Sequence, residues 1–483
     1  MINLVFDYMS VNGYIANCIN PKFHTKLFDL SFDTDKDNLA KTNLDGIDIV
    51  ACEPALGLLN NRKVLISIIE DSIKSKNTLW LYPIGTMGLN HKSFGVQKEY
   101  RNENIFNFIS KRALEYTEKY DNFKILIYTG LEHEMFLDYF KWIYIHLQDN
   151  NINPSNVYIV SNNFQNSDTN DYYLNKIGFT TDKKLNFITY YEQLKTKANE
   201  ISDSKLSSSF LSENEIVAKK KYKCLLLNRR LHIHRKVLLS LIAQYDLFDD
   251  NMISFDLDYH NNNFGDNFEY DIKSDAYIAS QDGKLLNKHE IKNELLENSL
   301  KYSILNGYKK LKKINKLSLD VSDLNSIEGR QQEIDDIDLY KKTYYSLVTE
   351  TEFFERTNGY TTEKILKPIQ QLHPFVLLGR PHVLKYLKEY GFKTFSDFWD
   401  ESYDNEEHSL KRMMKVFELF IELNDKSDDE WLDILKKMKP ILIHNRETLK
   451  KYSYKNDSNV INNLQKIISN EHNKENPTLL QKT

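Results

Sequence analysis

The residues best suited to chemistry lie in the second half of the chain, in two polar groups that each follow an apolar run. The first group is Asn228-Arg229-Arg230, which follows Tyr222–Leu227 and precedes an amphipathic segment. Guanidinium groups beside the N–H groups of a helix N-terminus bind phosphate through paired, charge-assisted hydrogen bonds and the helix dipole. These residues therefore suit a diphosphate, and a pair of solvated arginines at a turn is the simpler alternative.

The second group follows the apolar run at residues 344–350. It consists of Thr351, Tyr360, Thr362, Glu363 and Lys364. Thr362 and Glu363 fall in the first turn of a predicted helix, where the helix dipole favours an acceptor or an anion. Lys364 is unusual in a first turn unless an anion compensates its charge. Glu363 could therefore hold a sugar hydroxyl and Lys364 a phosphate, although an ordinary helix cap explains the same residues more simply.

The motif Tyr360-x-Thr362-Glu363-Lys364 resembles the donor-site signature of the α-1,3-fucosyltransferase family. In that family a Phe-Glu-Asn-Ser strand end precedes Tyr-Val-Thr-Glu-Lys. Here the strand end is Val348-Thr349-Glu350-Thr351 and the following loop is longer. The resemblance covers about residues 222–400, a segment that is also similar to glycosyltransferase-like proteins of large viruses and phages. It implies the GT-B architecture, in which two Rossmann-like domains face across a cleft.

The resemblance also implies roles for individual residues. Glu363 would contact the sugar, Lys364 would contact phosphate, and Arg229 or Arg230 would be the counterpart of the family's donor-site arginine. The implied donor is a nucleotide sugar, with a GDP-sugar such as GDP-fucose favoured. The resemblance also implies that the transfer inverts the configuration at the anomeric carbon. Positive groups would stabilise the departing diphosphate, so we expect that no metal or other cofactor is required.

A catalytic base is expected in the N-terminal half of the chain. A carboxylate at the carboxyl end of a strand could deprotonate an acceptor hydroxyl. Glu53 follows the apolar run at 47–51, and Glu132 and Glu134 follow the run at 123–129. Of these we select Glu53 and Glu132. Carboxylates in the first turn of a helix are the simpler alternative.

Two further features, a pair of histidines and one arginine, could belong to a site. His232 and His234 alternate after the first polar group, but no cysteine or carboxylate cluster accompanies them, so we do not expect a metal site. Arg380 follows the apolar run at 374–379 and either reaches the ligand or lies exposed.

Short apolar runs that alternate with segments of helix period must position these residues. In the first 195 residues, five runs rich in β-branched and aromatic residues predict strands at 47–51, 78–85, 123–130, 156–163 and 185–191. The segments 104–116 and 132–147 carry apolar residues at helix period. Such alternation predicts a parallel sheet covered by helices, and we assign residues 1–200 to a Rossmann-like acceptor domain.

The alternation fades at 196–221, where Ser and charged residues predominate, and then restarts. Residues 344–395 show a β-α-β-α-β pattern that ends in a short strand at 392–395. We assign 201–400 to a Rossmann-like nucleotide-sugar domain with a polar insertion at about 256–338. Residues 401–483 form a predicted helical tail, with a capping box at Ser427–Glu430 and an interruption at Pro440.

Composition narrows the class of protein. A length of 483 residues suggests two or three domains, and the net charge of −5 argues against nucleic acid as the main partner. The three cysteines lie far apart, which fits a reducing compartment. The sequence shows neither a basic, apolar leader nor a run of about 18 apolar residues. We therefore expect a cytoplasmic protein without a membrane anchor, in the host cytoplasm if the chain is viral.

Together these features predict an α/β glycosyltransferase of GT-B type. It would move a sugar, fucose by the resemblance, from a nucleotide-diphosphate donor to a hydroxyl on a glycan, protein or other acceptor. The lack of GxGxxG, Walker, HExxH and GxSxG motifs disfavours dinucleotide oxidoreductases, P-loop NTPases, zincins and α/β-hydrolases. Two alternatives stay open. One is a non-catalytic nucleotide-sugar-binding or virion structural protein on the same scaffold, and the other is a glycosyltransferase acting on a DNA base.

Overall fold

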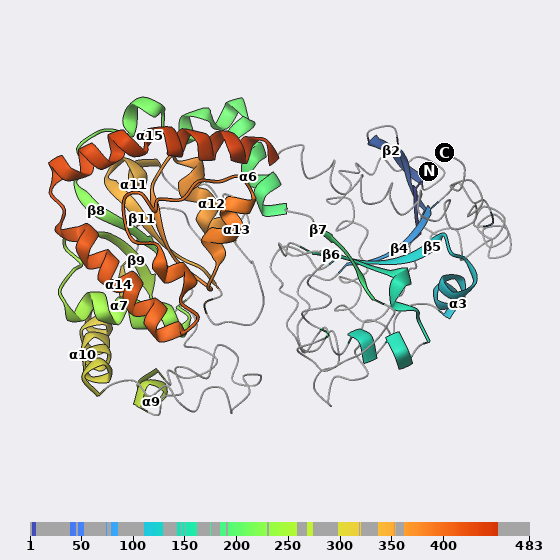
Figure 1. Ribbon diagram of the computed structural model, residues 1–483, viewed down its shortest axis with the longest axis horizontal. Coiled ribbons are helices and arrows are strands. Elements are labelled where there is room, and N and C mark those ends of the chain that lie inside the picture. The colour runs from blue at the N-terminus through green and yellow to red at the C-terminus, as the bar shows by residue number, and fades with distance from the viewer. Residues whose placement is uncertain are drawn as a thin grey trace, which may run out of the picture. The chain divides into compact units, whose positions relative to one another are not determined.

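The computed structural model shown in Figure 1 describes residues 2–5, 39–44, 47–52, 74, 79–85, 111–128, 143–145, 147–149, 151–161, 174, 184–189, 192–228, 231–257, 268–273, 298–317, 319, 337–351, 353 and 362–452. The chain divides into two compact units at about residue 192. Each unit is built on its own β-sheet.

The first unit contains a seven-stranded sheet of order β2-β3-β1-β4-β5-β6-β7. Its strands are β1 (Ile2–Val5), β2 (Leu39–Leu44), β3 (Ile47–Cys52), β4 (Leu79–Gly85), β5 (Phe123–Tyr128), β6 (Val157–Ser161) and β7 (Asn186–Thr189). All neighbours are parallel except β2 and β3, which form an antiparallel pair. The five predicted strands are confirmed as β3 to β7, whereas β1 and β2 were not predicted. Its described helical residues include α3 (Lys111–Lys119), the 3-10 turn η3 (Pro154–Asn156), and residues 143–145 and 147–149.

The second unit contains a five-stranded sheet of order β10-β9-β8-β11-β12. Its strands are β8 (Tyr222–Leu227), β9 (Met252–Asp256), β10 (Lys316–Leu317), β11 (Thr343–Thr349) and β12 (Phe375–Leu378). Only β10 is antiparallel to its neighbour. All seven residues of β11 are buried, as expected for an interior strand of a mainly parallel sheet with helices on both faces.

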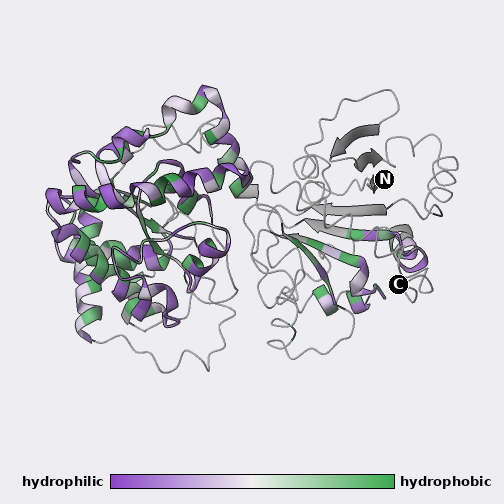
Figure 2. Cartoon of the chain, turned by 45° about the horizontal axis from the view of Figure 1, so that its top comes forward, coloured by the Kyte–Doolittle hydropathy of each residue, from purple (hydrophilic) through white to green (hydrophobic). Residues whose placement is uncertain are grey.

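Helices cover both faces of this second sheet. Its helical elements are α6 (Glu192–Ser202), η4 (Ser204–Ser209), η5 (Glu213–Glu215), α7 (Ile233–Gln244), α9 (Phe268–Lys273), α10 (Asn298–Ile314), α11 (Ile337–Lys341), α12 (Glu363–Gln370), α13 (Val383–Glu389), η7 (Ser402–Asn405), α14 (Ser409–Asp425) and α15 (Asp428–Lys450). Helices α12 and α15 contact each other on one side, and α7 and α14 contact each other on the other (Figure 1). Figure 2 shows hydrophobic and hydrophilic residues alternating along the helices of this unit, as expected for helices that pack against a sheet.

The strand orders confirm the α/β class, with two Rossmann-like, mainly parallel sheets and a helical C-terminal region. Two local predictions were wrong. Residues 392–395 form no strand, because the side chain of Asn445 on α15 takes their backbone bonds: Lys393 N donates to Oδ1 at 2.7 Å, and Nδ2 donates to Lys393 O at 2.8 Å. Pro440 does not interrupt the tail, since α15 runs through it.

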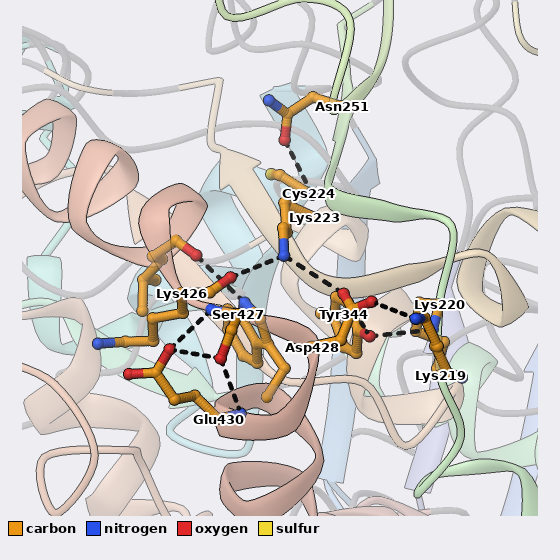
Figure 3. Close-up of polar contacts among 12 residues, drawn as sticks. Lys219, Lys220, Lys223, Cys224, Asn251, Tyr344, Lys426, Ser427, Asp428 and Glu430 are labelled. Carbon is orange, nitrogen blue, oxygen red and sulfur yellow. Dashed lines mark hydrogen bonds and ion pairs between the residues drawn. The ribbon is translucent and has the colours of Figure 1, made fainter.

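Hydrogen bonds and an ion pair join the amino end of the second sheet to the N-terminus of α15 (Figure 3). Asp428 accepts hydrogen bonds from Tyr344 Oη at 3.1 Å and from Lys223 Nζ at 3.4 Å, and it pairs with Lys219 at 2.9 Å. The predicted capping box of Ser427 and Glu430 is confirmed directly beside this cluster. These contacts hold the start of α15 at the amino ends of β8 and β11, whereas the candidate site lies at their carboxyl ends.

Candidate functional site

The carboxyl ends of β8 and β11 meet at a topological switch point. Strand β8 connects through α7 to β9 on one side, while β11 lies on the other side of β8. In open parallel sheets, ligands bind in the crevice that such a reversal of strand order leaves outside the carboxyl ends. Asn228 follows β8 and Glu350 follows β11, so both lie at this crevice.

Three side chains from the β8–α7 segment converge on the end of β11. Asn228 is 1% exposed, and its Oδ1 accepts a hydrogen bond from Thr349 Oγ1 at 2.5 Å. His234 Nε2 lies 3.0 Å from the carbonyl oxygen of Glu350. Arg235 Nη2 donates to the carbonyl oxygen of Thr349 at 2.7 Å. Only Asn228 of these three was a predicted donor-site residue, because burial of a histidine and an arginine in a first helical turn depends on tertiary packing.

Glu350 joins the end of β11 to the start of α12. Its backbone N–H donates to Leu378 O at 2.9 Å, which extends the pairing of β11 with β12 by one residue. Its carboxylate accepts from Thr362 N at 3.2 Å and from Thr362 Oγ1 at 2.5 Å. Burial raises the pKa of Glu350, while the charge of Lys364 and the bonds from Thr362 act in the opposite direction. One carboxylate thus links the end of β11 to the N-cap of α12.

Thr362 is the N-cap of α12, and its hydroxyl group positions the residues that follow it. Its Oγ1 accepts from Lys364 N and from Lys364 Nζ, both at 3.2 Å. The ammonium group of Lys364 also donates to Glu363 Oε1 at 2.9 Å. Although burial acts to raise the pKa of Glu363, the charges of Lys364 and Lys367 hold it below its usual value. Glu350, Thr362, Lys364 and Glu363 therefore form one hydrogen-bonded relay, called the Glu350 relay below.

Arg412 of α14 holds the loops around this relay. Its guanidinium donates to Gly379 O at 2.9 Å, to Phe353 O at 2.5 Å, and to two carbonyl groups at 406 and 407. It also lies 4.7 Å from the centre of the Phe353 ring, and that ring stacks on His234 at 5.0 Å. Arg380 is only 2% exposed, and burial together with the charge of Arg412 lowers its pKa to about 9. The sequence left two possibilities for Arg380, contact with the ligand or exposure to solvent. Exposure to solvent was wrong.

The structure brings several predicted residues together and leaves others outside its description. Asn228, Thr362, Glu363 and Lys364 are linked through Thr349 and Glu350, and Thr351 follows Glu350 directly. Five predicted residues lie outside the described residues: Glu53, Glu132, Arg229, Arg230 and Tyr360.

The described part of the chain holds neither a cluster of metal ligands nor a helix that could span a membrane. Within the ranges given above, no group of three or more His, Cys, Asp or Glu residues is placed to hold a metal ion. None of the helices that the structure describes combines the length and the apolar character needed to cross a bilayer.

Comparison with known proteins found similar solved structures and nothing else. No family model matches the sequence, and no curated protein matches it. A trehalose-6-phosphate synthase, OtsA, aligns with a TM-score of 0.37 and 10% identity over 96% of this chain and 98% of that one. A trehalose-6-phosphate structure from E. coli bound with UDP-2-fluoro glucose gives 0.33 and 10%, with the same coverage. An α,α-trehalose-phosphate synthase (UDP-forming) from Burkholderia vietnamiensis gives 0.34 and 7% over 97% and 99%.

Proposed function

We propose that the chain is a glycosyltransferase that binds a nucleotide-diphosphate sugar at the switch point of the second unit and transfers the sugar to a hydroxyl acceptor. The observation that carries the proposal is the Glu350 relay. It holds Glu363 and Lys364 in the first turn of α12, beside the carboxyl ends of β8 and β11. A cation, an anion and the N–H groups of a helix start are thereby gathered at the place where this class of sheet binds ligands.

The relay suits a diphosphate ester. The ammonium group of Lys364, together with the positive end of α12, would stabilise the negative charge that develops on the departing diphosphate. The carboxylate of Glu363 is kept ionised by Lys364 and Lys367, so it can accept hydrogen bonds from sugar hydroxyls. Arg229 and Arg230, which follow β8, would add bidentate phosphate contacts, and Asn228, Thr351 and Tyr360 complete the proposed donor site.

The identity of the transferred sugar and of the catalytic base is proposed from the sequence. The motif at 360–364 favours fucose from GDP-fucose as the transferred sugar. The first unit would supply the acceptor contacts and the base, for which Glu53 and Glu132 are the candidates. A carboxylate in that position would remove the proton of the acceptor hydroxyl as the sugar is transferred.

The test is a thermal-shift screen of the purified chain against GDP, UDP, ADP, CMP and their common sugars, followed by a turnover assay with the donor that stabilises it. Stabilisation by one nucleotide sugar, lost in Lys364→Met and kept in Lys385→Met, is the expected result. Lys385 is an exposed lysine of α13 and serves as the matched control.

Each other outcome of the screen has a defined meaning. Binding without turnover on any hydroxyl acceptor would favour a non-catalytic nucleotide-sugar-binding protein. Transfer to duplex DNA alone would favour the DNA-base glycosyltransferase. Failure of every nucleotide to stabilise the chain would contradict the proposed function.

A further inference from the structure

Two deeply buried polar atoms at the switch point have no hydrogen-bond partner in the described part of the chain. They are Nδ2 of Asn228 and Nδ1 of His234. The two side chains are 1% and 0% exposed, respectively. Buried polar atoms of folded proteins are nearly always paired, so each unpaired atom calls for a partner such as a bound group.

Both atoms belong to side chains that are anchored by their other polar atom. Asn228 Oδ1 accepts the hydroxyl hydrogen of Thr349, which leaves the amide N–H groups of Asn228 as donors. His234 Nε2 faces the carbonyl oxygen of Glu350 at 3.0 Å. Since Thr349 and Glu350 are consecutive, the two anchored side chains lie at the same end of β11, beside the carboxyl end of its neighbour β8.

The contact with Glu350 also fixes which ring nitrogen of His234 carries the proton. A carbonyl oxygen only accepts, so Nε2 must be the donor and Nδ1 of the neutral ring is an acceptor. Burial, together with the charges of Arg235 and His232, lowers the pKa of His234 well below its usual value, so the ring stays neutral at pH 7. A phosphate oxygen cannot donate to this nitrogen, whereas a hydroxyl group can.

We infer that Asn228 and His234 form a subsite for the hydroxyl groups of the bound donor, either on its ribose or on its transferred sugar. One hydroxyl donates to His234 Nδ1, and an oxygen of the same hydroxylated ring accepts from Asn228 Nδ2. This inference rests on the proposed donor site and assigns different parts of the donor to different segments of that site. The start of α12 binds the diphosphate, and Asn228 and His234 bind the hydroxyl groups.

His373 provides an internal control, because it is a second buried histidine with the same proton arrangement. Its Nε2 donates to Thr343 O at 2.9 Å, and its Nδ1 accepts from Ser346 Oγ at 2.8 Å. Burial lowers its pKa to about 3. The two rings are thus both neutral, and they differ in whether Nδ1 already has a partner.

The test is ¹⁵N NMR of histidine-labelled protein, with the His234 resonances assigned by their loss in His234→Phe or in His234→Gln. Three probes are added in turn: the nucleotide sugar that stabilises the chain best in the screen, free ribose at high concentration, and inorganic pyrophosphate. The hydroxylated probes should move the His234 Nδ1 resonance towards that of a hydrogen-bonded nitrogen, such as Nδ1 of His373. Pyrophosphate should leave it in place, and no probe should move His373.

A second measurement uses affinity. His234→Phe keeps the stacking on Phe353 and removes both the acceptor Nδ1 and the bond from Nε2 to Glu350 O. It should weaken binding of the nucleotide sugar about tenfold and leave binding of pyrophosphate unchanged. His232→Phe is the control and should bind as the wild type does, because His232 lies two residues earlier, at the N-cap of α7, and its ring stacks on His234 at 5.9 Å.

The results separate this subsite from the proposed function. If a nucleotide sugar binds in a Lys364-dependent way without moving His234 Nδ1, the subsite is refuted and the proposed function stands. If ribose moves His234 Nδ1 while no nucleotide binds through Lys364, the subsite stands and the proposed function is refuted. If no probe moves His234 and none binds, both are refuted.

Discussion

The side chain of Glu350 accepts two hydrogen bonds from Thr362, from Oγ1 at 2.5 Å and from the backbone N–H at 3.2 Å. This pair joins the end of the interior strand β11 to the N-cap of α12 across eleven intervening residues. Because Thr362 in turn accepts from Lys364, the position of the lysine depends on a carboxylate fourteen residues away in sequence. The candidate site is thus organised by a contact that no local motif contains.

Thr362→Val should destabilise the second unit by about 1–3 kcal/mol. Valine has nearly the same shape but loses the cap of α12, and it leaves the buried carboxyl of Glu350 without one of its partners. Thr362→Ser keeps the hydroxyl and is the control. Urea unfolding monitored by circular dichroism measures the difference, and equal midpoints for the two variants would contradict the described role of Thr362.

Gly307→Ala should lower the free energy of unfolding by about 1–3 kcal/mol, because α10 and α7 pack backbone to backbone at this glycine. A methyl group there would overlap the carbonyl oxygen of Ser240 on α7, and the helices would have to separate. Ser303→Ala on α10 removes only an exposed hydroxyl that donates within its own helix. Thermal unfolding of the two variants should therefore show a large loss for Gly307→Ala and little change for Ser303→Ala.

The stability of the second unit should fall as the pH is lowered from about 4.5 to about 2. Hydrogen bonds from Ser212, and then the contact with Lys341, lower the pKa of Glu215 from 4.5 to about 2. A carboxyl group whose folded-state pKa lies below its unfolded value contributes stability above the unfolded pKa. That contribution is lost as the pH falls through the folded pKa.

Glu215→Gln isolates this contribution, because glutamine does not titrate. The difference in unfolding free energy between wild type and variant should shrink as the pH falls across that window, and added salt should reduce it at neutral pH. A difference that stayed constant from pH 5 to pH 2 would show that Glu215 titrates normally.

Much of the fold could be predicted because buried parallel strands appear in the sequence as apolar runs. Tyr222–Leu227 is the clearest case, since the apolar run in the sequence and the observed strand β8 span the same residues. β9 was missed because its five residues merge into the polar stretch that follows. The strand predicted at 392–395 failed because the pairing partner of those residues is the side chain of Asn445, which lies fifty residues further along the chain.

The candidate site could be predicted only where a residue's role is local. Thr362 caps the helix that follows it, which the sequence indicates. Glu350 looked like a departure from the family's strand end, and its role appears only when β11 and α12 are placed in register. The burial of His234 likewise depends on Phe353 and Arg412, which come from two other segments.

The measurement that tests the account most directly is donor binding by Lys364→Met beside Lys385→Met, with thermal shift and a turnover assay on the same preparations. We predict that the wild type and Lys385→Met are stabilised by one nucleotide sugar and turn it over. Lys364→Met should remain folded and lose affinity by a factor on the order of ten or more, which corresponds to about 1.4 kcal/mol or more for the charged hydrogen bond to phosphate. Equal donor affinity in the two variants would contradict the assignment of the donor site to the first turn of α12.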